Sequence, residues 1–200
     1  MMVSRTQNSF RLFQKAKTAS CFLFFLLVLP SFSQDTEAIG KVEFKTSHVG
    51  DESSFVGAGY VGWQWKTDWM VGVGANFLIT KIDYQQPGWD KPVQLEMVSA
   101  GVINEKQFDA FGNLFWAINL YTGVGYLNSE GKSGSFEDHN ETDFYIALEP
   151  GMLLVCRLRG GFALTAGVSY HLPVGIDHSV YENQDFRGVQ FGIGMELNMR

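Results

Sequence analysis

Apolar and polar residues alternate along several stretches of this chain. Over residues 189–199 every odd position is apolar, and the even positions are Gln, Gly, Gly, Glu and Asn. A period of two residues predicts a β-strand with two different faces. The same alternation over 69–79, 114–126 and 162–172 predicts three more strands.

Four further runs alternate less regularly and are also expected to form strands. They are 41–48, 54–65, 93–103 and 143–158. The alternation in the third run shifts after Met97, which predicts a β-bulge. Pro150 predicts a second bulge at Glu149–Gly151, because a closed sheet has no edge strand to accommodate a proline. No stretch keeps a helical period, so we expect eight strands.

Shorter and longer connections alternate between these strands. The shorter ones are expected at 66–68, 104–112 and 159–161, and the longer ones at 81–92, 128–142 and 173–186. Only the first connection, near 49–53, breaks this rule by being short. Short turns at one end and long loops at the other are typical of an up-and-down barrel with both termini on the same side.

The second face of the predicted strands is rich in Gly, Asn, Gln, Ser, Ala and Tyr, with few charges. In a soluble barrel this face would meet water and should be charged. Glycine suits the interior of a narrow eight-stranded barrel, where side chains share little space. The bulkier apolar face suits hydrocarbon, where a charge at mid-depth costs roughly 2–4 kcal/mol. We therefore expect the apolar face to point outward into a membrane.

Three tryptophans lie around one of the short turns. Trp63 and Trp65 end one predicted strand and Trp69 begins the next. Because indole rings favour the membrane–water interface, we expect these residues to belong to an aromatic girdle at the barrel rim. An ordinary aromatic core cluster is the alternative.

Residues 1–33 are expected to be a cleaved signal peptide, which leaves residues 34–200 for the barrel. Four basic side chains and no acid precede the ten-residue apolar run 21–30. Ser31 and Ser33 fit the small-residue positions before a cleavage site. A membrane anchor is the less favoured alternative, because a spanning helix needs about 20 apolar residues.

The charge of the remaining chain excludes one class of partner. Four of the 15 Lys and Arg residues lie in 1–34, which leaves 11 against 21 Asp and Glu. With a formal net charge of −10 and no basic patch to neutralise phosphates, nucleic acid is not an expected partner. Cys156 is then the one remaining cysteine, so no internal disulfide is expected.

Charged residues on the predicted interior face are expected to form a polar network that plugs the lumen, because buried charges need partners. They are Lys41, Glu43, Lys45, Glu96, Glu149, Arg157 and Glu196. The first and last strands are neighbours in a closed barrel, so Lys41 and Glu43 should lie at the depth of Glu196. A small conduction path or gate is the alternative, but eight strands leave room only for side chains.

No catalytic residue, cofactor or metal site is expected. The four histidines lack tight ligand spacing and are expected in water near the external end: His48, His139, His171 and His178. Ser169 and His171 share one face of a strand, but that face is the lumen, and no third group can be named to orient the histidine as a base. Acidic external loops suggest a solvated surface, or divalent-cation bridges to lipopolysaccharide phosphates, or adhesion to a partner.

These features together resemble the small bacterial outer-membrane β-barrels of the OmpA/OmpX-like class over residues 35–200. Gln34 after an expected cut at Ser33 resembles exported proteins of Bacteroidota. The resemblance implies a closed, antiparallel, up-and-down eight-stranded transmembrane β-barrel in the outer membrane, with both termini periplasmic. Such barrels usually end in an aromatic residue that the barrel-assembly machinery reads, whereas this chain ends Leu-Asn-Met-Arg, and Phe191 is the last aromatic.

The expected function is that of a non-catalytic outer-membrane barrel with a structural, adhesive or interaction role. Its expected partners are outer-membrane lipid, lipopolysaccharide and the barrel-assembly machinery, with an extracellular or periplasmic protein as a further candidate. Two alternatives stay open: a barrel enzyme that modifies lipid A, and a secreted soluble, lipocalin-like barrel that binds an apolar ligand.

Overall fold

The computed structural model describes residues 36–50, 52–65, 68–80, 82–84, 93–132, 138–177 and 181–199. The chain divides into two units, Met1–Thr36 and Glu37–Arg200, and the fold below is that of the second unit. The signal peptide expected at residues 1–33 lies outside the described residues.

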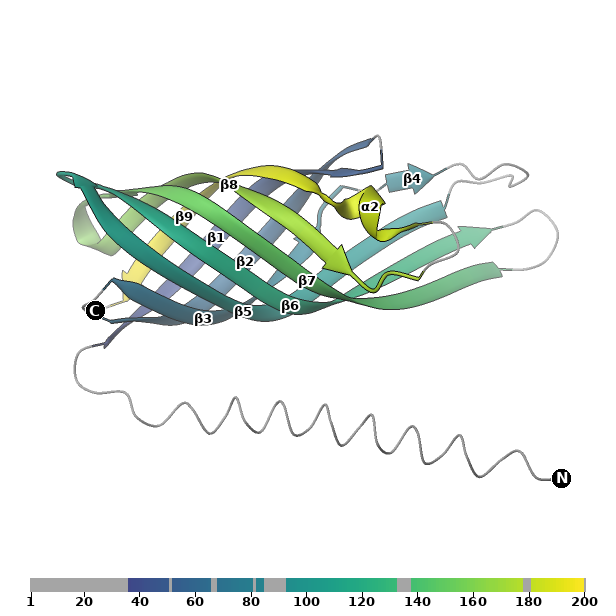
Figure 1. Cartoon of the computed structure of the whole chain (residues 1–200), viewed down its shortest axis with the longest axis horizontal. Coiled ribbons are helices and arrows are strands. Elements are labelled where there is room, and N and C mark those ends of the chain that lie inside the picture. Colours follow the sequence, from purple (N-terminus) through teal and green to yellow (C-terminus); the bar gives the residue numbers. More distant parts are fainter. Residues whose placement is uncertain are drawn as a thin grey trace, which may run out of the picture. The chain divides into compact units, whose positions relative to one another are not determined.

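The second unit is a closed antiparallel β-barrel (Figure 1). Its strands are β1 (Thr36–Val49), β2 (Glu52–Trp65), β3 (Trp69–Leu78), β4 (Ile82–Tyr84), β5 (Val93–Phe111), β6 (Leu114–Lys132), β7 (Asp138–Arg157), β8 (Phe162–Val174) and β9 (Gly188–Met199). Each strand pairs with the next except β3, which pairs with β5, and β4 continues along β5 beyond β3. The ring closes where β1 meets β9, which confirms the expected eight-stranded up-and-down barrel.

The connections at the two ends of the barrel differ in length, as expected. We call the end with connections 66–68, 112–113 and 158–161 the turn end, and the opposite end the loop end. Strands β5, β6 and β7 have 19, 19 and 20 residues and extend beyond their neighbours at the loop end (Figure 1).

The predicted bounds of two connections are wrong, because β5, β6 and β7 are longer than the sequence pattern suggested. The connection expected at 104–112 is strand up to Phe111, and only Gly112 and Asn113 form the turn. Gly112 has a φ of 60°, a conformation that glycine adopts without strain. The loop expected at 128–142 is likewise shortened, since β6 runs to Lys132 and β7 starts at Asp138.

Neither expected bulge is present in the described strands. The pairing of β5 with β6 keeps one register past Met97, and its one irregularity lies between Asp109 and Phe111. The β7–β8 pairing stops after Leu148, opposite Leu172, and resumes in the same register at Gly151. Proline lacks an N–H, so it interrupts the ladder at Pro150 without shifting it.

The outer face of the barrel is apolar, as expected. Exposed large apolar side chains follow the alternation on every long strand, for example Val42, Val61, Val73, Ile118, Met152, Leu164 and Ile193. The part of β5 near the loop end differs from the expectation: Leu95 and Met97 are buried inside, and Glu96 is exposed outside. No helix among the described residues is long and apolar enough to cross a membrane.

Glycines on the inner face make room for aromatic rings from the neighbouring strand. Gly125 of β6 is the cross-strand partner of Tyr145, and a Cβ atom on Gly125 would lie 2.0 Å from Cζ of that ring. Gly74 of β3 is likewise the cross-strand partner of Tyr60, and a Cβ atom on Gly74 would lie 2.3 Å from Cδ1 of that ring. These contacts give a specific physical reason for the glycine-rich face.

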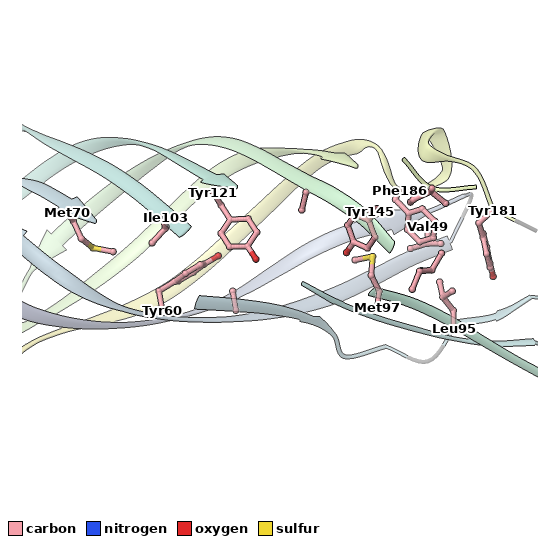
Figure 2. Packing of buried hydrophobic residues seen from close by; sticks show 14 of the residues in the cluster. Val49, Tyr60, Met70, Leu95, Met97, Ile103, Tyr121, Tyr145, Tyr181 and Phe186 are labelled. Atoms are coloured by element: carbon pink, nitrogen blue, oxygen red, sulfur yellow. The ribbon is translucent and has the colours of Figure 1, made fainter. Parts of the chain in front are cut away.

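Buried apolar side chains line the interior along the barrel, from Met70 and Ile103 to a group at the loop end that we call the apolar cluster (Figure 2). Leu95, Met97 and Val49 come from the barrel wall, and Tyr181 and Phe186 come from the connection between β8 and β9. This connection contains α2 (Asn183–Phe186), a single turn with a reciprocal capping box between Glu182 and Asp185. The Gly50 N–H donates to the Asp185 carbonyl at 2.7 Å, which ties the connection to the β1–β2 turn.

Candidate functional site

The interior between the turn end and the apolar cluster holds a network of ion pairs. Strand β1 contributes three of its members at alternate positions, Lys41, Glu43 and Lys45, so that all three point inward. Nζ of Lys41 lies 2.8 Å from Oε2 of Glu105 on β5 and 3.0 Å from Oε1 of Glu43. Lys45 pairs with Glu149 on β7, and its Nζ lies 3.5 Å from Oε2 of Glu43.

Uncharged side chains extend this network around the wall. The Lys45 amino group donates to the Tyr60 hydroxyl at 3.3 Å, and this hydroxyl donates to Oδ1 of Asn76 at 2.8 Å. On the other side, the Ser169 hydroxyl donates to Oε1 of Glu149 at 2.9 Å. Hydrogen bonds of this kind reduce the cost of holding charges away from water.

Arg157 ends the network at the turn end. Its Nη2 donates to Oε1 of Gln107 at 2.7 Å and lies 3.3 Å from Oδ1 of Asp68. The guanidinium also lies 3.9 Å from the centroid of the Phe115 ring, within the range of a cation–π contact. Gln107 in turn donates to Oε1 of Glu105 at 3.0 Å, so a continuous chain of contacts joins Arg157 to Lys41 and Lys45.

Glu196 lies in the same interior but outside these pairs. It is the cross-strand partner of Lys41, at the depth that the sequence predicted. The Lys41 amino group nevertheless contacts Glu43 and Glu105, and no hydrogen bond reaches Oε2 of Glu196 from the described residues. The Glu196 side chain is buried, with the whole residue 3% exposed.

The sequence missed Glu105 and misplaced Glu96. Glu105 was assigned to a turn because 104–112 was read as a connection, and Glu96 was assigned to the lumen because a bulge was expected after Met97. Without the bulge, the odd positions face inward from Leu95 to Gln107, which places Glu105 inside and Glu96 outside. Strict continuation of the alternation from Leu95 would have found Glu105.

His171 lies on the lumen face of β8, as the alternation predicted, but it is buried rather than exposed to water. Its Nδ1 lies 3.6 Å from Oε2 of Glu149, the same carboxylate that accepts the Ser169 hydrogen bond. A nucleophilic site needs the serine hydroxyl on the histidine and the carboxylate behind it. Here both side chains instead approach Glu149, and no hydrogen bond joins Ser169 to His171, both of which the structure describes.

The other histidines give no site. His48 is exposed on β1, and the side chains of His139 and His178 lie outside the described residues. The described residues contain no group of three or more His, Cys, Asp or Glu that could hold a metal ion. Cys156 is a free, partly buried cysteine.

The tryptophans lie on the outside of the barrel at the turn end. Trp63 and Trp69 are exposed, and Trp65 is partly buried. Phe108 and Trp116 add a stacked pair at the same end, with ring centroids 4.3 Å apart. Aromatic side chains therefore flank this rim on both sides of the β2–β3 turn.

Comparisons with known proteins found likeness in structure alone. No protein-family model matches the chain, and neither does any curated protein. Neisserial surface protein A is 14% identical, with a TM-score of 0.56 over 82% of this chain and 97% of that protein. A second similar structure is Ail, the attachment invasion locus protein of Yersinia pestis, in complex with the heparin analogue sucrose octasulfate. Ail is 11% identical, with a TM-score of 0.57 over 83% of this chain and 100% of that protein.

A third similar structure covers this chain to a comparable extent. A major outer membrane protein from Thermus thermophilus is 10% identical, with a TM-score of 0.57 over 81% of this chain and 99% of that protein. At such low identity the likeness concerns the backbone fold. The second unit of this chain therefore has the fold of small eight-stranded outer-membrane β-barrels.

Proposed function

We propose that this protein is a non-catalytic barrel of the bacterial outer membrane with a structural, adhesive or interaction role. One observation carries the proposal: apolar side chains are exposed around the outside of the barrel while charged side chains are buried within it. This arrangement is the reverse of a soluble barrel and suits a protein whose outer face meets hydrocarbon. Both termini of the barrel are then periplasmic, and the barrel-assembly machinery inserts it.

The proposed partners are lipid and lipopolysaccharide. Glu52, Glu96, Asp177 and Glu182 are exposed towards the loop end, which is the external end in this proposal. Divalent cations bound by such carboxylates would bridge to lipopolysaccharide phosphates, or an external protein with a basic surface would bind there. The surface-protein and attachment-protein names of two structural neighbours are consistent with a role at the cell surface.

The lumen is proposed to be closed rather than conducting. The ion-pair network occupies the interior from Arg157 to Glu149, and the apolar cluster around Phe186 lies beyond it towards the loop end. Eight strands enclose little more than the volume of their own side chains. Ser169 and His171 both approach Glu149, and this arrangement supports a role in packing rather than in catalysis.

Membrane extraction and gel migration test the proposed location. We expect the protein to fractionate with outer membranes, to need detergent for release, and to migrate faster on an SDS gel before boiling than after boiling. Closed membrane barrels retain their hydrogen-bonded ring in SDS until they are heated. Release without detergent, or identical migration before and after boiling, would contradict the proposal.

A variant pair tests the absence of catalysis. Ser169→Ala and His171→Phe are expected to leave the acyl pattern of lipid A unchanged, as read by mass spectrometry of cells with and without the protein. A change that depends on the protein and disappears in both variants would support the lipid-modifying enzyme instead.

A further inference from the structure

The buried charges inside the barrel do not balance. Among the described residues, the buried Lys and Glu side chains are Lys41, Lys45, Glu43, Glu105, Glu149 and Glu196, and His171 is buried beside Glu149. Two ammonium groups face four carboxylates, which is a formal charge of −2 before any proton or ion is bound. Arg157 and Asp68 do not change this balance, because they pair with each other at the turn end and remain partly exposed.

Glu196 carries one of the two excess negative charges and has no ammonium group paired with it. Both lysines are engaged with Glu43, Glu105 and Glu149. Oε2 of Glu196 receives no hydrogen bond from the described residues, although the residue is 3% exposed. An ionised carboxylate in such surroundings is costly unless another positive charge compensates it.

Side chains from several strands face Glu196. Lys41 and Glu43 come from β1, Glu105 comes from β5 and Arg157 from β7, and all four interact with it electrostatically. The neighbouring strand β8 contributes Ala163, its uncharged cross-strand partner. The two acidic neighbours oppose the two basic ones, so these surroundings do not neutralise Glu196.

We propose that the barrel interior binds a small monovalent cation, a proton or an alkali-metal ion, at Glu196. A multidentate divalent-metal site does not fit, because no group of three acidic, histidine or cysteine ligands gathers among the described residues. This binding site goes beyond the envelope role proposed above and does not depend on it, since it follows from the charges inside the barrel.

Thermal unfolding of the whole protein in detergent tests the proposal, with Glu196→Gln as the neutral variant of the same shape. If the cation is a proton, the folded barrel binds one proton more than the unfolded chain, so stability falls as pH rises. The unfolding midpoint of the wild type should then fall by about 3–5 °C for each pH unit between the pKa of a glutamate in the unfolded chain, about 4.3, and the pKa of Glu196 in the folded barrel, beyond the fall seen in Glu196→Gln.

A salt series distinguishes the two cations. If an alkali-metal ion is bound, replacing N-methylglucamine chloride by NaCl or KCl at constant ionic strength should raise the wild-type midpoint and leave Glu196→Gln unchanged. Glu96→Gln is the matched control, because that carboxylate is exposed on the outer face. It should respond to pH and salt as the wild type does.

Infrared spectroscopy of the folded wild type gives a second readout that requires no unfolding. A proton on Glu196 predicts a carbonyl band of a protonated carboxylic acid that is absent in Glu196→Gln. The proposal is overturned if the wild type and Glu196→Gln respond identically to pH and to alkali salts and no such band differs. The change in gel migration on boiling tests the closed membrane barrel and does not depend on cation binding. A failure of the cation proposal is therefore distinguishable from a failure of the outer-membrane assignment.

Discussion

Glycine and aromatic residues act as pairs in the barrel wall. The ring of Tyr145 lies over Gly125, and the ring of Tyr60 lies beside Gly74. An aromatic side chain that covers a cross-strand glycine buries apolar area and leaves no void. The inner-face glycines are therefore sites of close packing rather than of backbone flexibility.

Gly125→Ala is expected to destabilise the folded barrel by about 1–3 kcal/mol, because the new methyl group overlaps the Tyr145 ring. The measurement is the midpoint of urea unfolding in detergent. Gly59→Ala is the matched control, since a Cβ atom there meets no atom within 4 Å. Equal midpoints for the two variants would show that the ring is not held over Gly125.

The sequence was sufficient to predict that the glycine-rich face is the interior of the barrel. It was not sufficient to predict which aromatic ring covers which glycine. The period of two residues and the scarcity of charge are local properties of one strand. The pairing of Gly125 with Tyr145 depends on the register between β6 and β7, and a shift of one residue would place the two on opposite faces.

At the scale of elements, the connection between β8 and β9 differs most from its expectation. The sequence predicted a long external loop over 173–186, and the described part contains an ordered turn of helix. Phe186 is 1% exposed and packs in the apolar cluster with Tyr181. Backbone contacts from Gly50 and Asp177 hold the connection against β1 and β7.

Phe186→Ala is expected to release this connection, because truncating a buried Phe costs about 3–5 kcal/mol. Trypsin added to intact cells should then cleave after the exposed Arg187 at least about tenfold faster than in the wild type. The fragments are measured by mass spectrometry.

Gln184→Ala provides the control for this experiment, because its side chain is exposed on the same helix. It should be cleaved at about the wild-type rate. If both variants are cleaved equally fast, Phe186 does not anchor the connection.

At the scale of the whole molecule, the closed ring determines what the two faces of each strand meet. Every strand of the eight-stranded ring pairs with two neighbours, so the ring has no unpaired strand edge to expose to lipid. The apolar face then surrounds the barrel, and the charged side chains of β1, β5 and β7 converge inside it.

Ile193→Arg tests this orientation in the folded protein. Ile193 is 68% exposed near the middle of β9, between Phe44 and Ala166 on the neighbouring strands. At the midplane of a bilayer the arginine should cost about 2–4 kcal/mol, measured by unfolding from lipid vesicles.

Leu158→Arg is the matched control at the turn end, where an exposed arginine reaches water and should cost no more than about 1 kcal/mol. In a soluble barrel the two substitutions would have the same small effect. Equal stabilities would therefore contradict the lipid-facing assignment.

The sequence by itself determined the number of strands, the closure of the barrel and the outward direction of the apolar face. These properties follow from alternation and composition within single strands, together with the lengths of the connections between them. Where a local irregularity was read into this pattern, at Met97 and Pro150, the prediction was wrong, because β5 stays in register with β6 past Met97 and β7 stays in register with β6 and β8 across Pro150.

Only the tertiary structure decided which interior charges meet. Lys41 bonds with Glu105, 64 residues away, and Lys45 bonds with Glu149, 104 residues away. Such contacts cross the lumen, so they depend on the relative depth of strands that are not neighbours. The relative depth of two such strands depends on the register of every strand pair between them around the ring. It therefore cannot be predicted from any single stretch of the sequence.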